Sequence, residues 1–192
     1  MSNLHTSPTA KRPMSMEPKK FALWLFIVSV VMFFAAFTSA YIVRQADGNW
    51  FHYDIPSVFY YSTVIILLSS ATMHWATLAT KQDDIPKIKL ALIITTVLGF
   101  GFLITQFIGY KVLVAADVYF VGNPSGSFFY VITGVHGLHI VSGIIYLLIT
   151  LASSFKFKIH SKSMLQVEMC ATYWHFLGVL WVYLLVFMMM NR

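Results

Sequence analysis

The chain has 192 residues, of which 58% are hydrophobic and only 10% are charged, and its mean hydropathy is +0.74. Soluble domains carry about 25% charged residues, so this composition excludes a soluble globular domain and predicts an integral membrane protein. The single cysteine, Cys170, excludes an intramolecular disulfide framework.

The first twenty residues are rich in Ser, Thr, Pro and Lys, which is typical of a mobile tail. The apolar run that follows begins at Phe21 and is longer than the 7–15 residues of a signal-peptide core. The sequence "TSA" at 38–40 resembles a signal-peptidase site, but the length of the run favours a retained first helix. We therefore predict an N-terminal tail over residues 1–20.

Five apolar stretches then follow one another, and each is longer than the roughly 20 residues that cross the hydrocarbon core of a bilayer. Their apolar residues are continuous and do not alternate with a period of two, which favours helices over a β-barrel. We predict an all-α integral membrane fold in which residues 21–192 form one bundle of five transmembrane helices. The spans are expected at about 21–43, 56–80, 87–113, 127–154 and 164–190.

The basic residues are distributed unevenly between the two sides of this topology. Ten fall on the side of the N-terminus and three on the other. By the positive-inside rule, the N-terminus is cytoplasmic and the C-terminus lies outside. This asymmetry also accounts for the net charge of +6 without a nucleic-acid partner. The ten are Lys11, Arg12, Lys19, Lys20, Lys81, Lys87, Lys89, Lys156, Lys158 and Lys162; the three are Arg44, Lys111 and Arg192.

Small residues recur at helical spacing in three of the spans, which favours close approach between helices in lipid. We expect such contacts in the first, third and fourth spans. The residues are Ala35 with Ser39, Ala36 with Ala40, then Gly101, Thr105 and Gly109, then Gly134, Gly137 and Gly143.

Polar side chains inside the predicted spans are costly and need an explanation. They are His74, Gln106, His136, His139, Glu168 and His175. A neutral histidine can be a packing residue whose nitrogens bond to neighbouring groups, or it can ligate haem or a metal. His136 and His139 are three residues apart on one helix and cannot sandwich one haem, whereas His136 and His175 come from different helices and could.

An independent haem-binding protein and a transporter therefore remain alternatives. Glu168 is the one acidic residue within a predicted span. This disfavours a metal site built from carboxylates and histidines. The spans contain no central proline and the two halves show no repeat, unlike many transporters. Glu168 and His175 are seven residues apart and share a helix face, with Trp174 beside them. This face is expected to hold a lipid headgroup or part of another protein.

Five segments together resemble subunit III of the haem–copper respiratory oxidases, the cytochrome c oxidase subunit III family, in its five-helix form. The most specific are a G-[FV]-H-G-L-H block in the penultimate span and a Y-W-H-F block in the last. The segments are "LFIVSVVMFFAAFTSAYIVR" (25–44), "LLSSATMHWA" (67–76), "ITQFIGYKVL" (104–113), "TGVHGLHIVSG" (133–143) and "EMCATYWHFLGVLWVYLLVF" (168–187).

The resemblance implies an accessory subunit, in a bacterial inner membrane, of an oxygen-reducing and proton-translocating terminal oxidase. The haem and copper would belong to subunits I and II, and this chain would carry no cofactor, metal or catalytic centre. It would pack beside subunit I, bind phospholipid and support proton uptake. The partners would include subunits I and II, a small further subunit and possible supercomplex members. The corresponding subunit of a quinol oxidase or nitric oxide reductase assembly is the alternative within the family.

The motif residues His136, His139, Glu168, Trp174 and His175 are expected to be structural or to contact lipid or a partner. Three positions depart from the family pattern, because apolar residues stand where members usually have acids. These are Val30 in the first span, Gly109 in the third and Gly178 in the last. Roles that depend on those carboxylates therefore do not carry over to this chain.

Overall fold

The computed structural model describes residues 17–48, 50–82, 84–155 and 164–191. These residues form five α-helices, and no strand occurs among them. All five are long and apolar enough to cross a membrane, which confirms the predicted fold class. The helices are α1 (Pro18–Ala46), α2 (Val58–Lys81), α3 (Ile85–Ala115), α4 (Pro124–Phe155) and α5 (Met164–Met190).

Helices α1, α3 and α4 extend beyond the predicted spans at both ends, whereas α2 begins two residues later than predicted and α5 matches its span. The prediction that the tail reaches residue 20 is wrong for its last three residues, because α1 begins at Pro18. Proline is favoured in the first turn of a helix, and lysine side chains can extend from a helix end to the headgroups. Residues 1–16 of the predicted tail lie outside the described residues.

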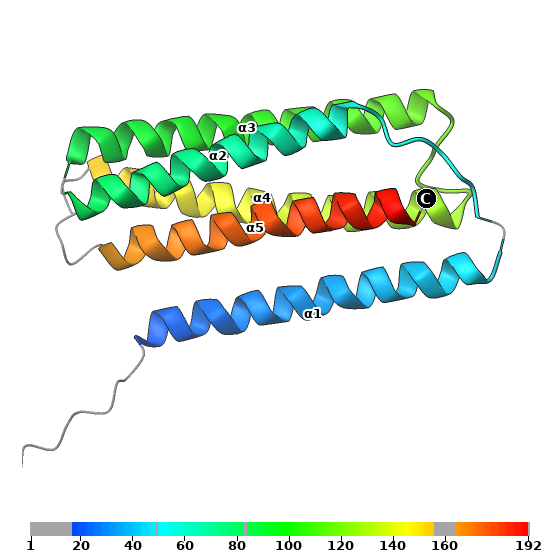
Figure 1. Cartoon of the computed structure of the whole chain (residues 1–192), viewed down its shortest axis with the longest axis horizontal. Helices are drawn as coiled ribbons and strands as arrows, with labels where there is room; N and C mark the ends of the chain where they lie inside the picture. The colour runs from blue at the N-terminus through cyan, green and yellow to red at the C-terminus, as the bar shows by residue number, and fades with distance from the viewer. Residues whose placement is uncertain (1–16, 49, 83, 156–163, 192) are drawn as a thin grey trace, which may run out of the picture.

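The helices pack as a bundle with α1 at its edge (Figure 1). Helix α2 packs against α3 and α5, and α4 packs against α3 and α5, while α1 contacts α4 and α5. In the most apolar part of each helix, half of the residues are buried in α5 but only 22% in α1. Helix α5 is therefore central to the bundle, and α1 presents most of its surface to the surroundings.

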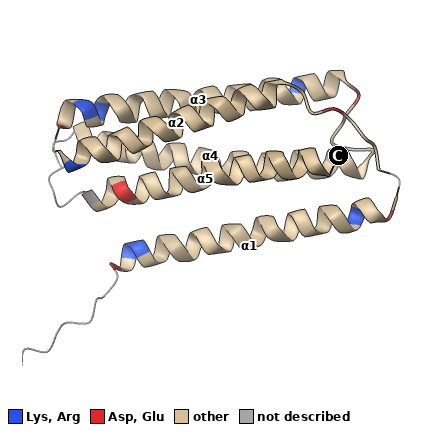
Figure 2. Ribbon diagram, in the orientation of Figure 1, with Lys and Arg blue, Asp and Glu red and all other residues tan. Residues whose placement is uncertain are grey.

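Charged residues lie near the two ends of the bundle (Figure 2). We call the end that carries the N-terminus of α1 the basic end. It gathers Lys19, Lys20, Lys81, Lys87 and Lys89 from three helices, whereas the described part of the opposite end has Arg44 and Lys111. The remaining basic residues fall outside the described residues. The grouping agrees with the charge asymmetry in the sequence, and the direction of the chain across a membrane stays a prediction.

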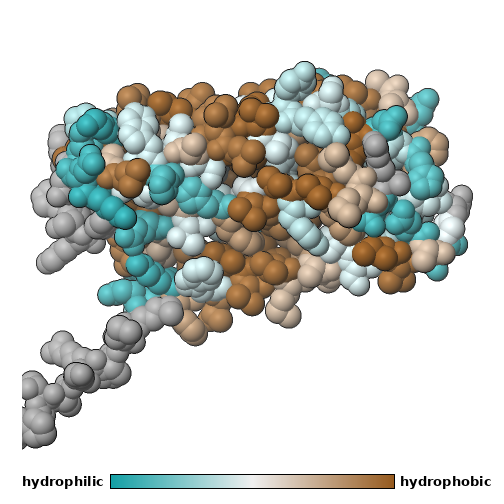
Figure 3. Space-filling model, viewed as in Figure 1, coloured by the Kyte–Doolittle hydropathy of each residue, from teal (hydrophilic) through white to brown (hydrophobic). Residues whose placement is uncertain are grey.

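Between the two ends, apolar side chains dominate the visible surface (Figure 3). Large apolar residues are exposed on every helix, for example Met32 on α1, Val97 on α3 and Val179 on α5. A bilayer would cover such side chains at no cost, since lipid tails are as apolar as they are. The exposed surface is therefore that of a membrane-embedded bundle.

Two of the glycines predicted at close helix contacts have that role, and others do not. A Cβ on Gly109 would lie 2.7 Å from Phe59 Cζ, and a Cβ on Gly143 would lie 2.9 Å from Leu177 Cδ1. At Gly101 the nearest atom is 3.9 Å away, and Gly134 and Gly137 have nothing within 4 Å. The prediction is therefore wrong at Gly134 and Gly137, which face open space, while a Cβ on Gly101 would make only an ordinary contact with Ile65.

The predicted contacts of the first span are also wrong. Ala35, Ala36, Ser39 and Ala40 are all exposed. Helix α1 instead buries Phe34 and Tyr41 almost fully. Its small residues face outward, and two of them line a groove described below.

Candidate functional site: the intramembrane histidines and the groove beside α5

His136 of α4 is fully buried among aromatic rings from three other helices. Its ring stacks on Trp181 with 5.3 Å between centroids and contacts Phe34 and Phe102 edge-on at 6.3 and 6.2 Å. Neither ring nitrogen has a hydrogen-bond partner within the described residues. The side chain thus fills the core at the centre of α1, α3, α4 and α5.

His139 lies one turn further along α4, against α1. Its Nδ1 donates a hydrogen bond to the Val135 carbonyl over 2.8 Å, which holds the ring close to its own helix. The ring contacts Phe34 and Phe26 of α1, at 5.7 and 6.4 Å between centroids. The two motif histidines of α4 therefore share Phe34 as a neighbour and help to position α1.

Trp174 of α5 sits where three helices meet it closely. Its Nε1 donates a hydrogen bond to Ser69 Oγ of α2 over 3.1 Å. A Cβ on Gly99 of α3 would lie 2.8 Å from Trp174 Cη2, and one on Gly143 of α4 would lie 3.3 Å from the same indole. The indole thus occupies space that glycines on two helices leave free. The sequence left Trp174 either a structural residue or a contact to lipid or a partner, and its near-complete burial favours the structural role.

Glu168 of α5 forms an ion pair with Lys20 of α1, with 3.0 Å between Nζ and Oε2. The two side chains remain 41% and 40% exposed for Lys20 and Glu168. This pair joins α1 to α5 at the basic end. Sequence reasoning identified the carboxylate but missed Lys20, because the two residues are 148 positions apart.

His175 of α5 faces α2. Its Nδ1 is hydrogen-bonded to Ser70 Oγ, and its ring lies 6.4 Å from the ring of His74, measured between centroids. His136 has no ring contact with His175 among the described residues; its neighbours are the three aromatic rings named above.

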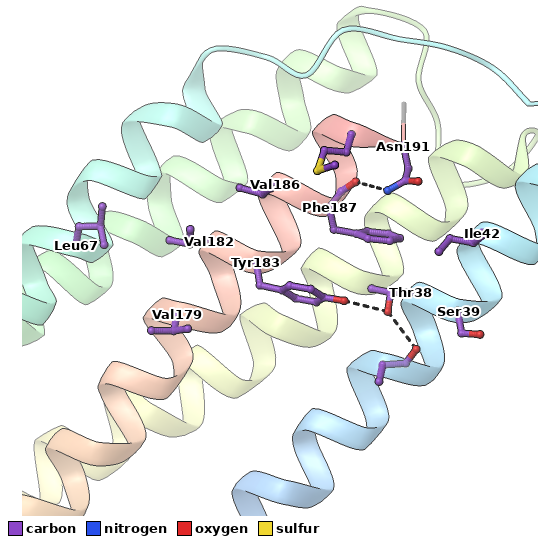
Figure 4. A pocket seen from close by; sticks show the side chains of 12 residues that line it. Thr38, Ser39, Ile42, Leu67, Val179, Val182, Tyr183, Val186, Phe187 and Asn191 are labelled. Atoms are coloured by element: carbon purple, nitrogen blue, oxygen red, sulfur yellow. Dashed lines mark hydrogen bonds between the residues drawn. The ribbon is translucent and has the colours of Figure 1, made fainter.

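Residues on one side of α5, from Val179 to Met190, border a groove between α1 and α2. Its cavity volume is about 960 Å³, and Figure 4 shows α5 as its floor, α1 as one wall and Leu67 of α2 on the other side. The lining is mostly apolar and includes Ala35, Ser39, Ile42, Val179, Val182 and Val186. The sequence analysis did not predict this groove. The small residues of α1 were the one sequence feature that pointed to it.

Hydrogen bonds tie α1 to α5 at the far end of the groove as well. Tyr41 Oη and Gln45 Nε2 both donate to the Asn191 carbonyl, over 3.1 and 2.9 Å. Tyr183 Oη donates to Thr38 Oγ1 over 3.4 Å (Figure 4). Together with the ion pair at the basic end, these bonds hold the two helices at both ends and leave the groove between them.

The described residues contain no group of three or more His, Cys, Asp or Glu side chains that could hold a metal ion. The His74–His175 pair forms a polar cluster with Ser70 within the spans.

Comparison with known proteins identifies the family. The family model of cytochrome c oxidase subunit III matches residues 6–191. The chain belongs to this family.

Subunit III proteins from distant organisms are similar over most of the chain. One is the cytochrome bo(3) ubiquinol oxidase subunit 3 of Buchnera aphidicola, 27% identical over 90% of this chain and 94% of that protein. Cytochrome c oxidase subunit 3 of Rattus norvegicus is 31% identical over 91% of this chain and 70% of its own length. The probable cytochrome c oxidase subunit 3 of Rickettsia felis is 30% identical over 95% and 70%.

The three positions where this subunit III chain lacks an expected acid lie in different surroundings. Val30 is buried and lies one turn from both Phe26 and Phe34, which contact His139. Gly109 has no room for a larger side chain against Phe59, whereas a Cβ on Gly178 would make an ordinary contact of 3.8 Å with Ile66. Phe59 thus fills the space that an acid at position 109 would need. At position 30 the buried side chain is apolar.

Proposed function

We propose that this chain is a non-redox accessory subunit of a haem–copper terminal oxidase in a bacterial inner membrane, with its N-terminus in the cytoplasm. The observation that carries the proposal is the match to the subunit III family over residues 6–191. Relatives named as subunits of cytochrome c oxidase and of a ubiquinol oxidase support the assignment to a respiratory oxidase. The basic end supports the orientation, because cytoplasmic loops are enriched in Lys and Arg.

The motif residues act in this proposal as structural elements of the bundle. His136 and Trp174 fill the centre of the fold, and His139 supports α1. The oxidase would hold its haem and copper in subunits I and II, while this chain packs beside subunit I and supports proton uptake. The aromatic surroundings of His136 support a packing role, since Trp181 covers a face of its ring.

The groove beside α5 is the proposed phospholipid site. Its apolar lining matches acyl chains, and it opens on the surface that lipid would cover. A bound lipid would fill the space between α1 and α2 that no described side chain fills. The groove would thereby stabilise α1, the least buried helix of the bundle.

The electron donor is set by other subunits, and cytochrome c is our first proposal. A quinol is the second candidate, favoured by the similarity to the Buchnera ubiquinol oxidase subunit. The haem type and the partner subunits of the purified complex distinguish the two.

The proposal is tested by purification in mild detergent through a tag on this chain. We expect subunits I and II to copurify with their haem, visible in the reduced-minus-oxidised spectrum. When this chain alone is stripped off, the haem should remain with the other subunits. A chain that purifies alone with stoichiometric haem would contradict the proposal.

A further inference from the structure

The strongest unassigned feature is a polar cluster on the surface where α2 meets α5. The His74 side chain is exposed and lies beside the half-buried ring of His175. The Ser70 hydroxyl is hydrogen-bonded to Nδ1 of His175, and Nε2 of His175 lies on the other side of that ring. Among the described residues, the His74 ring makes a ring contact but no hydrogen bond. Figure 3 shows hydrophilic side chains on this face of the molecule, set in from the basic end among apolar neighbours.

The cluster lies within two helices that are long and apolar enough to cross a membrane. Helix α2 ends at Lys81, and His74 is seven residues before it, about 10 Å along the axis at 1.5 Å per residue. Ser70, at the level of His175, is about 16 Å from that end by the same rise. Half of the hydrocarbon core is about 15 Å thick, so with Lys81 at the edge of the core the cluster would extend to its middle.

A lipid tail is a poor cover for this cluster. Acyl chains have no hydrogen-bonding groups, and an unsatisfied polar group in hydrocarbon is costly. In membrane proteins, imidazoles and hydroxyls in the core face other helices and bond across to them. The polarity of the cluster therefore selects a protein neighbour over a lipid.

The shape of α2 around His74 also suits a neighbouring helix. Ala71 is exposed one turn before it, with Ser70 beside it, and Thr77 lies about one turn after it. Small residues let the backbones of two helices approach closely in lipid. We call the surface formed by Ser70, Ala71, His74, Thr77 and His175 the imidazole face.

We propose that a transmembrane helix of another oxidase subunit docks on the imidazole face and presents a hydroxyl, amide or carboxyl side chain to His74 and His175. The proposal rests on the proposed function, since it requires the chain to be part of a complex. The docked helix would stand beside the groove and close its open side along α2. Its hydrogen bond would satisfy the imidazoles that the isolated bundle leaves facing outward.

The first test is site-specific photo-crosslinking in the intact complex in native membranes. A photoreactive amino acid replaces Ala71, and in the matched control it replaces Val97 of α3. Val97 is 63% exposed and lies about 18 Å from the start of its own helix at 1.5 Å per residue. We expect the Ala71 probe to crosslink to one apolar segment of another subunit, long enough to span the membrane. A hydroxyl, amide or carboxyl residue should lie within one turn of the attachment point.

The second test compares two substitutions of one residue. His74→Leu removes the hydrogen-bonding nitrogens and suits a lipid neighbour, whereas His74→Gln keeps a donor and an acceptor. We expect His74→Leu to weaken retention of the crosslinked subunit about threefold, a typical effect of an interhelical hydrogen bond in membranes. His74→Gln should restore most of it, with equal amounts of this chain in the membrane for both variants.

Several results overturn the proposal while the accessory function stands. In a complex that purifies with its haem, the probe at Ala71 could form adducts with lipid alone, or it could crosslink to a second copy of this chain. The probe at Val97 could also crosslink to the same segment as the probe at Ala71. Equal retention in both His74 variants also overturns it. Failure of any complex to copurify would instead contradict the proposed function.

Discussion

Two glycines of α3, eight residues apart, provide a direct test of the packing. A Cβ on Gly109 would lie 2.7, 3.0 and 3.1 Å from three atoms of the Phe59 ring, whereas the nearest atom to a Cβ on Gly101 is 3.9 Å away. Phe59 is fully buried and is held against Phe129 and Trp181, at 5.3 and 6.3 Å between ring centroids. The ring therefore cannot move aside without disturbing its own neighbours.

The expected magnitudes follow from this difference in space. Overpacking a filled core costs about 1–3 kcal/mol, and replacing a helical glycine by alanine recovers about 0.5–1 kcal/mol. Gly109→Ala should therefore lower the free energy of unfolding by about 1–2 kcal/mol. Gly101→Ala should leave it unchanged or raise it by up to about 1 kcal/mol.

The assay is unfolding of the purified chain in mixed micelles with increasing SDS, followed by tryptophan fluorescence. Both variants are compared with the unmodified chain in the same detergent. Equal effects of the two substitutions, or a Gly109→Ala chain more stable than the original, would refute the reasoning. Either result would mean that α2 and α3 are not as close at Phe59 as the structure places them.

Further predictions concern charged and titratable groups. A double-mutant cycle with Lys20→Met and Glu168→Gln should give a coupling free energy below about 1 kcal/mol, because both side chains are partly exposed and exposed ion pairs are weak. A coupling of several kcal/mol in the SDS assay would mean that the pair is buried. Carbodiimide should not label residues 18–46, which contain no acid, and Val30→Glu should introduce a site there; mass spectrometry showing equal labelling of both chains would contradict this. The Lys87 side chain and amide, which bond to Asp84, lower the pKa of that carboxyl. A carboxyl whose pKa is lowered by folding stabilises the folded state at pH values above its unfolded-state pKa, and this stabilisation is lost as pH falls through the folded-state pKa. Asp84→Asn should therefore lower the stability at pH 7 but not in strong acid. Thermal unfolding at both pH values measures the difference.

The sequence by itself determined the class, the number of helices and the family. Long apolar runs that no strand pattern interrupts predict five membrane helices, and the part of the chain that the structure describes forms five. The motif blocks around His136 and His175 led to the family that the comparison identifies. These features are local, because each can be read from residues within one span.

Only the tertiary structure decided which side of each helix meets another helix. In a soluble protein, hydrophobic periodicity marks the buried face, but in lipid both faces are apolar, so the pattern does not distinguish them. For this reason Gly101 and Gly109 look alike in the sequence although one of them alone lies tightly against a neighbour. The Lys20–Glu168 pair, the His74–His175 contact and the groove beside α5 join distant segments. They depend on how the helices are rotated about their axes, which is set by the packing of side chains such as Trp174 between them.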